Sequence, residues 1–221
     1  MKQLSSILLL LLVSLNFGCR KNCESEQVGE INLNDTSKKY TPYQNSETLT
    51  FVNEQGEEIV FTNEVVEESY RICTQFLCEN TSDPFDQTPC EYYQAQGIRN
   101  LLRTNSNDTL LIEMVVSTEN YESESTLFYD LFSVHMSKIG PLTRGQFIPH
   151  IGFTNPVLNE ANTIITDPMI EVDEIELMGE IYANVIYTDY GELGDQHAIY
   201  IKKEVGIIFI LLDGVLWRKA I

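Results

Sequence analysis

The chain has 221 residues, and its 33 acidic against 14 basic side chains give a net charge of −19 at neutral pH. Such a surface repels phosphate groups, which argues against nucleic acid as a partner and against charge-driven binding to an anionic membrane. A hydrophobic fraction of 43% is sufficient for a packed core, and the length suits one large all-β domain.

The start of the chain combines a short apolar run with a cysteine. The run, residues 7–13, has the length of a signal-peptide core and is too short to span a membrane. Gly18 and Cys19 follow at the place where a bacterial lipoprotein leader is cut and the cysteine receives a diacylglycerol. We therefore expect residues 1–18 to be removed and Cys19 to carry acyl chains such as palmitate. Ordinary cleavage without lipid is the alternative, because Asn16 stands where the lipoprotein pattern usually has an aliphatic residue.

The cysteine count agrees with lipid attachment. An odd number of cysteines in an exported protein leaves one thiol to explain, and with Cys19 lipidated four remain for two disulfides. These four are Cys23, Cys73, Cys78 and Cys90. Three pairings are open; we favour Cys78 with Cys90, which closes the polar loop between them, and Cys23 with Cys73. One disulfide with two buried thiols is the alternative.

The composition divides the chain into three parts. Residues 1–18 are expected to be the signal peptide. Residues 19–46 begin with the cysteine expected to carry lipid, and their polar composition predicts a flexible tether with a short strand near 30–33. Residues 47–221 show the alternation of apolar and polar side chains that marks half-buried strands. We expect a single all-β domain there.

The strands are expected in hairpins. Residues 49–52 and 59–62 flank a loop that contains Gly56, and Asp213-Gly214 lies between two apolar runs, which is a strong signal for a two-residue turn. Further strands are expected at 65–77, 90–102, 109–118, 126–136, 147–153, 175–187, 198–212 and 215–219. No segment shows sustained helical periodicity. The sequence predicts an antiparallel meander that forms a curved sheet, half-barrel or sandwich.

Residues 207–212, with the sequence Ile-Ile-Phe-Ile-Leu-Leu, have no polar face. Exposed, such a strand is an aggregation hazard, so we expect it to be covered on both sides. A central strand in a closed core is the first interpretation. A concave face that holds an apolar ligand is the second, and its candidate lining residues are Ile175, Leu177, Ile181, Val185, Ile208 and Ile210.

The C-terminal third carries a family resemblance. Residues 179–187 (GEIYANVIY), 199–208 (IYIKKEVGII) and the Asp213-Gly214 turn followed by Leu216-Trp217 resemble the ending of secreted lipoproteins from the Bacteroidetes, flavobacteria especially. The resemblance implies a small all-β envelope lipoprotein and no assigned activity. Some surface lipoproteins of that lineage have an acidic run after the lipidated cysteine, whereas this chain has Arg20-Lys21-Asn22. We therefore expect the periplasmic side of the outer membrane.

The sequence contains no recognisable catalytic or metal site. His135, His150 and His197 lie in separate strand contexts, and no Gly-x-Ser-x-Gly motif occurs. Adjacent carboxylates on a strand point to opposite faces and cannot act as a pair. Residues 195–197 offer too few donors for zinc, and the loop 189–195 lacks the donor order of a calcium-binding EF-hand. We predict no catalytic residue, metal or cofactor.

Three functional hypotheses follow. The first is a non-catalytic binding or structural module, anchored to the membrane by its lipid and engaging an envelope protein or a glycan. The second is a carrier of a lipid or other apolar ligand on the concave face of the sheet. The third is an enzyme assembled from carboxylates that are distant in sequence.

Overall fold

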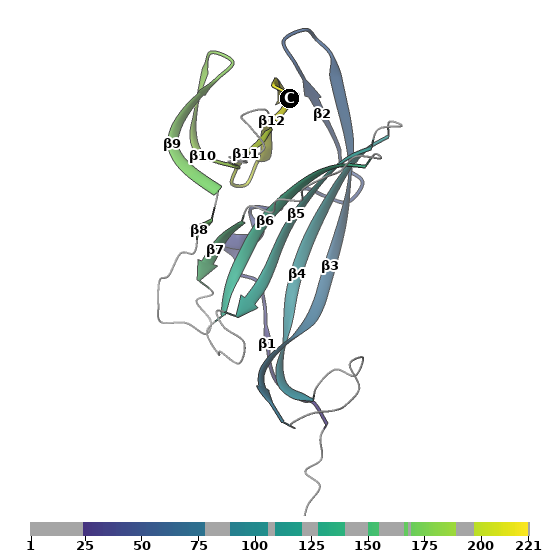
Figure 1. Ribbon diagram of the computed structural model, residues 1–221, viewed down its shortest axis with the longest axis vertical. Coiled ribbons are helices and arrows are strands. Elements are labelled where there is room, and N and C mark those ends of the chain that lie inside the picture. The colour runs from purple at the N-terminus through teal and green to yellow at the C-terminus, as the bar shows by residue number, and fades with distance from the viewer. Residues whose placement is uncertain are drawn as a thin grey trace, which may run out of the picture.

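The computed structural model (Figure 1) describes residues 24–77, 89–105, 109–120, 128–139, 150–154, 166–167, 169–188 and 197–220. Within these ranges the protein is almost entirely β-structure, with one short helix. The sheet is curled into a half-barrel, and neighbouring strands are antiparallel throughout its main path. The predicted fold class is therefore confirmed. No helix in the described ranges is long and apolar enough to cross a membrane.

The described strands belong to one sheet. Its order is β8-β7-β6-β5-β4-β3-β2-β13-β12-β11-β10-β9, and β1 joins β4 as a parallel neighbour outside this path. The elements are β1 (Glu26–Ile31), α2 (Asp35–Lys38), β2 (Thr48–Val52), β3 (Glu58–Phe76), β4 (Cys90–Thr104), β5 (Thr109–Asn120), β6 (Phe128–Ile139), β7 (His150–Thr154), β8 (Thr166–Asp167), β9 (Met169–Leu177), β10 (Glu180–Thr188), β11 (Ala198–Lys202), β12 (Gly206–Leu212) and β13 (Val215–Lys219).

Both hairpins that the sequence predicts from turn residues are confirmed. Strands β2 and β3 pair from Thr48 opposite Thr62 to Val52 opposite Glu58. Between β12 and β13, Asp213 and Gly214 both have positive φ, 51° and 77°. A two-residue turn of this kind requires that conformation at both positions, which explains the Asp-Gly pair.

The pairing of β2 with β13 joins the first half of the sheet to the second. Arg218 lies opposite Val52, and Lys219 lies opposite Phe51. The strands from β9 to β12 then curl back, so that the long strands β3 to β6 form one wall and the C-terminal strands form another (Figure 1). The main core lies between these walls and includes Leu102, Ile112, Met114, Phe132, Ile199, Ile201, Ile207 and Ile210.

Strand β12 is covered on both sides, as its apolar sequence predicts. Ile207 and Ile210 belong to the main core. Ile208 and Phe209 belong to a second core cluster, which the β9–β10 hairpin covers. A register shift in the β11–β12 ladder places two consecutive residues on that second side. The expectation that this run is covered on both sides is therefore confirmed for residues 207–210.

The expected tether is wrong for residues 24–46. After β1, residues 32–47 cross from β6 to the edge of β3, and we refer to them as the crossing segment. Leu33, Tyr40 and Tyr43 of this segment are buried in the main core. The Tyr40 ring lies 5.0 Å from that of Phe132 between centroids. At the β3 edge the backbone amide of Ser46 donates to a carbonyl of β3. Burial of large side chains fixes this polar stretch in place.

The favoured disulfide pairing is also wrong. Cys73 is bonded to Cys90, with a Cα–Cα distance of 5.6 Å. The reason is strand register: β3 extends to Phe76, so Cys73 lies within the ladder to β4 and not at the start of a loop. Its neighbour across the ladder is the beginning of β4, where Cys90 lies. Of the other cysteines, Cys19, Cys23 and Cys78 lie outside the described residues.

Candidate functional site

An open polar groove lies where β1, β3 and β4 run side by side. Its volume is about 370 Å³. Strands β3 and β4 form its floor, and the end of β1 forms one side. The lining residues are Glu30, Asn32, Glu67, Glu68, Ser69, Gln94, Ala95 and Gln96.

The groove continues the core-facing side of the sheet. Alternate residues of a strand share a face, so Gln94 and Gln96 lie on the same side as Ile98 and Leu102. Leu102 is in the main core and Ile98 packs against it. Strand β1 runs parallel to β4 and places Glu30 opposite Gln94. The same face of β4 therefore changes from apolar to polar toward the beginning of the strand.

Two side chains of the groove are held in place by neighbours. Gln94 donates through Nε2 to the Ser69 hydroxyl at 2.7 Å and to the Tyr70 carbonyl at 3.2 Å. The Glu68 carboxylate forms an ion pair with the Arg99 guanidinium at 2.7 Å. These contacts fix the floor of the groove.

Three other side chains of the groove are available to a ligand. Glu30, Glu67 and Gln96 make no hydrogen bond or ion pair with any residue in the described ranges. The two carboxylates can only accept hydrogen bonds, whereas the amide can both donate and accept. A ligand rich in hydroxyl groups, which also donate and accept, matches this set.

Beside the groove, the Tyr70 ring packs closely over the backbone of β4. A Cβ added at Gly97 would lie 3.2 Å from a ring carbon of Tyr70, so glycine permits the approach. The Tyr70 hydroxyl donates to the Thr118 carbonyl at 2.8 Å. Burial, with a smaller contribution from the carboxylate of Glu119, raises the pKa of Tyr70 above its usual value. Burial likewise raises the pKa of Glu119 itself, against an opposing hydrogen bond from Ser117.

A buried carboxylate positions the chain that follows β1. Asp130 on β6 is fully buried and accepts hydrogen bonds from the backbone amide of Asn34 at 2.7 Å and from the Thr118 hydroxyl at 3.2 Å. Asn34 also caps α2, because its side chain accepts from the Thr36 amide. The end of β1 is thereby tied to β5 and β6, which holds the side of the groove that contains Asn32.

The six apolar residues proposed to hold a ligand are not brought to one surface. Ile210 lies in the main core, whereas Leu177, Val185 and Ile208 lie in the second cluster with Ile175 packed against it. Ile181 is 71% exposed. The single strand expected over residues 175–187 is wrong: β9 ends at Leu177, β10 begins at Glu180, and Met178 and Gly179 between them have positive φ of 50° and 75°. Five of the six therefore lie in or against two separate covered clusters, and the sixth lies in solvent.

The two histidines whose side chains the structure describes, His135 and His197, have different partners. His135 lies 3.9 Å from Glu113, and His197 lies 3.1 Å from Asp213 at the β12–β13 turn. The part of the chain that the structure describes holds no group of three or more histidine, cysteine or acidic side chains able to bind a metal ion. The predicted loop 189–195 lies outside it.

Sequence reasoning did not identify the groove, because its residues come from three strands. Their juxtaposition depends on the parallel pairing of β1 with β4, which antiparallel hairpin signals do not predict. One local signal was present: Gln94-Ala95-Gln96 places two amides on one face of a strand whose later residues are apolar on that face.

Comparisons of the chain with protein-family models, with curated proteins and with solved structures return no match. The class of the protein therefore rests on its own fold and groove. It is an all-β half-barrel with a polar groove on one face and a crossing segment that closes its core.

Proposed function

We propose that this protein is a non-catalytic binding module of the cell envelope, attached by a lipid at Cys19. The leader pattern and the cysteine count support the attachment. The resemblance to envelope lipoproteins supports the outer membrane, and Arg20-Lys21-Asn22, in place of an acidic run after Cys19, supports its periplasmic side. A Cys19→Ala variant is expected to leave the membrane fraction; an unchanged distribution between pellet and supernatant would refute lipid attachment.

The groove is the ligand site in this proposal, and the ligand is a hydroxyl-rich glycan that carries no net negative charge. The observation that carries this proposal is the groove itself, whose Glu30, Glu67 and Gln96 side chains are without partners in the described ranges. Carboxylate oxygens accept hydrogen bonds from sugar hydroxyls, and the amide completes the set as donor and acceptor. The net charge of −19 disfavours an anionic glycan.

The test is an array of neutral and amino-sugar oligosaccharides, followed by calorimetric titration of the oligosaccharides that bind. Gln96→Ala and Glu67→Gln are expected to weaken binding. Glu174→Gln, which changes an exposed carboxylate on β9, is the matched control and is expected to bind as the parent does. Binding that all three variants retain equally would contradict the groove as the site. Selective capture of lysine-rich peptides instead of sugars would indicate a protein partner.

A carrier of an apolar ligand is the second candidate, and one observation favours it. Asn100 on β4 has 0% exposure among apolar neighbours of the main core, and neither atom of its amide has a hydrogen-bond partner in the described ranges. Ligand pockets are mainly apolar with a few placed polar groups, and Asn100 is such a group. Opening would require the crossing segment to move. Mass spectrometry of lipids that co-purify with the detergent-extracted protein tests this candidate; an extract without a stoichiometric lipid would oppose it.

A further inference from the structure

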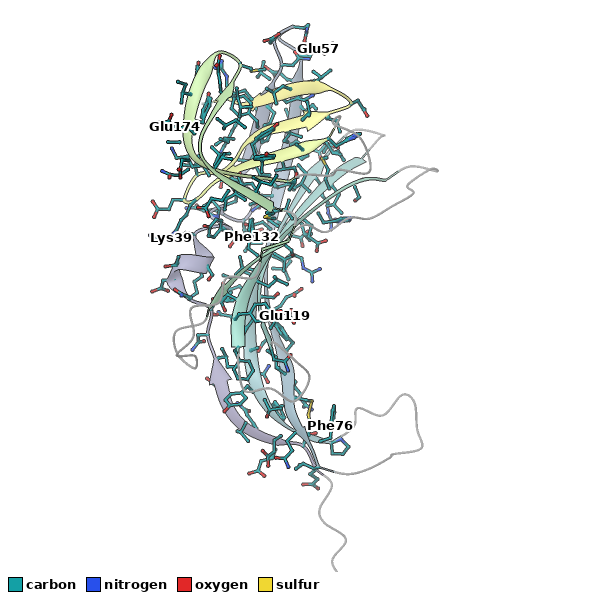
Figure 2. The ribbon with its side chains drawn as sticks, turned by 60° about the vertical axis from the view of Figure 1, so that its left-hand side comes forward. Lys39, Glu57, Phe76, Glu119, Phe132 and Glu174 are labelled. Carbon is teal, nitrogen blue, oxygen red and sulfur yellow. A yellow bond between two sulfur atoms is a disulfide. The ribbon has the colours of Figure 1, made fainter. Side chains whose placement is uncertain are left out.

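Three strand ends meet at one end of the sheet, which we call the N-terminal tip. Strand β3 ends there at Phe76, opposite Cys90 where β4 begins. Strand β1 also begins there, with Glu26 opposite Glu91. Figure 2 shows Phe76 at this end and Glu57, next to the beginning of β3, at the other. The disulfide between Cys73 and Cys90 ties the tip together.

The tip is also the place where the chain enters the fold. Glu24 is the first described residue, and it follows Cys19 by only five residues. A fully extended chain spans at most about 3.6 Å per residue, so these five residues span no more than about 18 Å. If Cys19 carries its lipid at the bilayer surface, the tip cannot lie farther from that surface than this distance. The inference thus rests on the proposed lipid attachment.

Two apolar side chains at the tip are nearly half exposed. Phe76 is 47% exposed and Val28, on β1, is 43% exposed. Tyr92 lies near them on β4, with the Arg71 guanidinium 4.7 Å from its ring centroid. Aromatic side chains with a polar end are enriched at membrane–water interfaces, and a phenylalanine at headgroup depth loses contact with water. These side chains match a bilayer surface.

Charge selects among bilayer surfaces. Glu24 and Glu26 are exposed at the tip, and Glu91 is half-buried beside them. These three carboxylates outnumber the Arg71 guanidinium, so the described side chains of the tip carry a net negative charge that anionic headgroups repel. Contact must then come from apolar burial on a zwitterionic surface. We propose that the N-terminal tip docks on the lipid bilayer through Phe76 and Val28, so that the long axis of β3 points away from the membrane.

The test uses the full-length lipidated protein in phosphatidylcholine vesicles whose acyl chains are brominated near the headgroup. Phe76→Trp adds a fluorophore at the tip. Val60→Trp is the matched control, because Val60 is 40% exposed on the same strand but 16 residues away, about 50 Å along β3. Each variant is compared with the parent chain, so that the signal of Trp217 cancels, and circular dichroism confirms that both are folded.

Bromolipid is expected to quench the tryptophan added at position 76, with a blue shift of its emission, and to leave the one at position 60 unquenched. Adding phosphatidylglycerol at low salt is expected to reduce the quenching. If the protein floats with the vesicles but both tryptophans are quenched equally or not at all, the docking is refuted and lipid attachment stands. If the protein does not float, both are refuted.

Discussion

Tyr43→Phe measures how much one buried hydrogen bond contributes to holding the crossing segment against β12. The Tyr43 side chain is 5% exposed, and its hydroxyl accepts a hydrogen bond from the backbone N–H of Ile207 on β12. The ring packs beneath Gly206, and the Lys219 ammonium lies 5.0 Å from its centroid. Phenylalanine keeps the ring in place and removes only the oxygen, so the substitution isolates the hydrogen bond.

The expected loss follows from the burial of the donor. Ile207 has 0% exposure, so its N–H cannot turn to water when the acceptor is removed. An unsatisfied buried donor costs about 1–3 kcal/mol. In a domain of this size each kcal/mol lowers the melting temperature by about 2–4 °C, which predicts a fall of at least about 2 °C. Burial raises the pKa of Tyr43 well above its usual value, so the hydroxyl stays neutral and the loss does not change with mildly alkaline pH.

The assay is urea and thermal unfolding followed by the fluorescence of Trp217, which packs against the main core. Tyr187→Phe is the control, because Tyr187 is half-buried and stacks on Tyr200 with 5.6 Å between ring centroids. The control is expected to lose little. If Tyr43→Phe loses no more stability than the control, the crossing segment is not held by this bond and the argument fails.

Three further outcomes are expected. Glu119→Gln should stabilise the protein at pH 7. Burial raises the pKa of the Glu119 carboxyl in the folded state, so the stability of the parent protein falls as the pH rises from the unfolded-state pKa through the folded-state pKa. The gain in melting temperature of the variant should therefore vanish in thermal melts near pH 4. Asn100→Leu should raise the free energy of unfolding by about 1–3 kcal/mol, because it removes a buried amide that has no hydrogen-bond partner in the described ranges. A lower free energy of unfolding in urea titration would contradict this prediction. Non-reduced peptide mapping should join Cys73 to Cys90 and the other two cysteines of the processed chain to each other; a different partner for Cys73 would contradict the β3–β4 register.

The parts of the fold that were predictable are those set by local signals. Alternation along β2, β5 and β13 indicates strands, and Asp213-Gly214 fixes its hairpin through the φ values that the turn requires. The apolar run in β12 predicts cover on both sides, and two core clusters supply it. Each of these signals acts within a few residues. None of them depends on which distant strands become neighbours.

The parts that were not predictable depend on register between distant segments. The Cys73–Cys90 bond follows from how far β3 extends before its loop, and alternation does not specify where a strand ends. The expected ligand face around Ile175 and Ile181 assumed one strand over residues 175–187. The chain instead turns back at Met178 and Gly179, both with positive φ, so Ile181 lies opposite Glu176 and on the other face of the hairpin from Ile175. The groove requires β1 to add to β4 in parallel, and a six-residue polar strand gives no sign of its partner.

The crossing segment shows why a polar stretch can be misread, and it shortens the distance over which the proposed lipid anchor could hold the domain. Leu33, Tyr40 and Tyr43 are few and follow no period, yet each is at least 94% buried. A tether of 28 residues would let the domain search for a partner far from the membrane. With the fold beginning by residue 24, the lipid proposed at Cys19 would hold the tip within about 18 Å of the bilayer. Gln94 lies four residues along β4 from Cys90, about 13 Å farther. In the proposed arrangement the groove would lie within roughly 30 Å of the membrane surface, close enough for a ligand that is attached to the membrane to reach it.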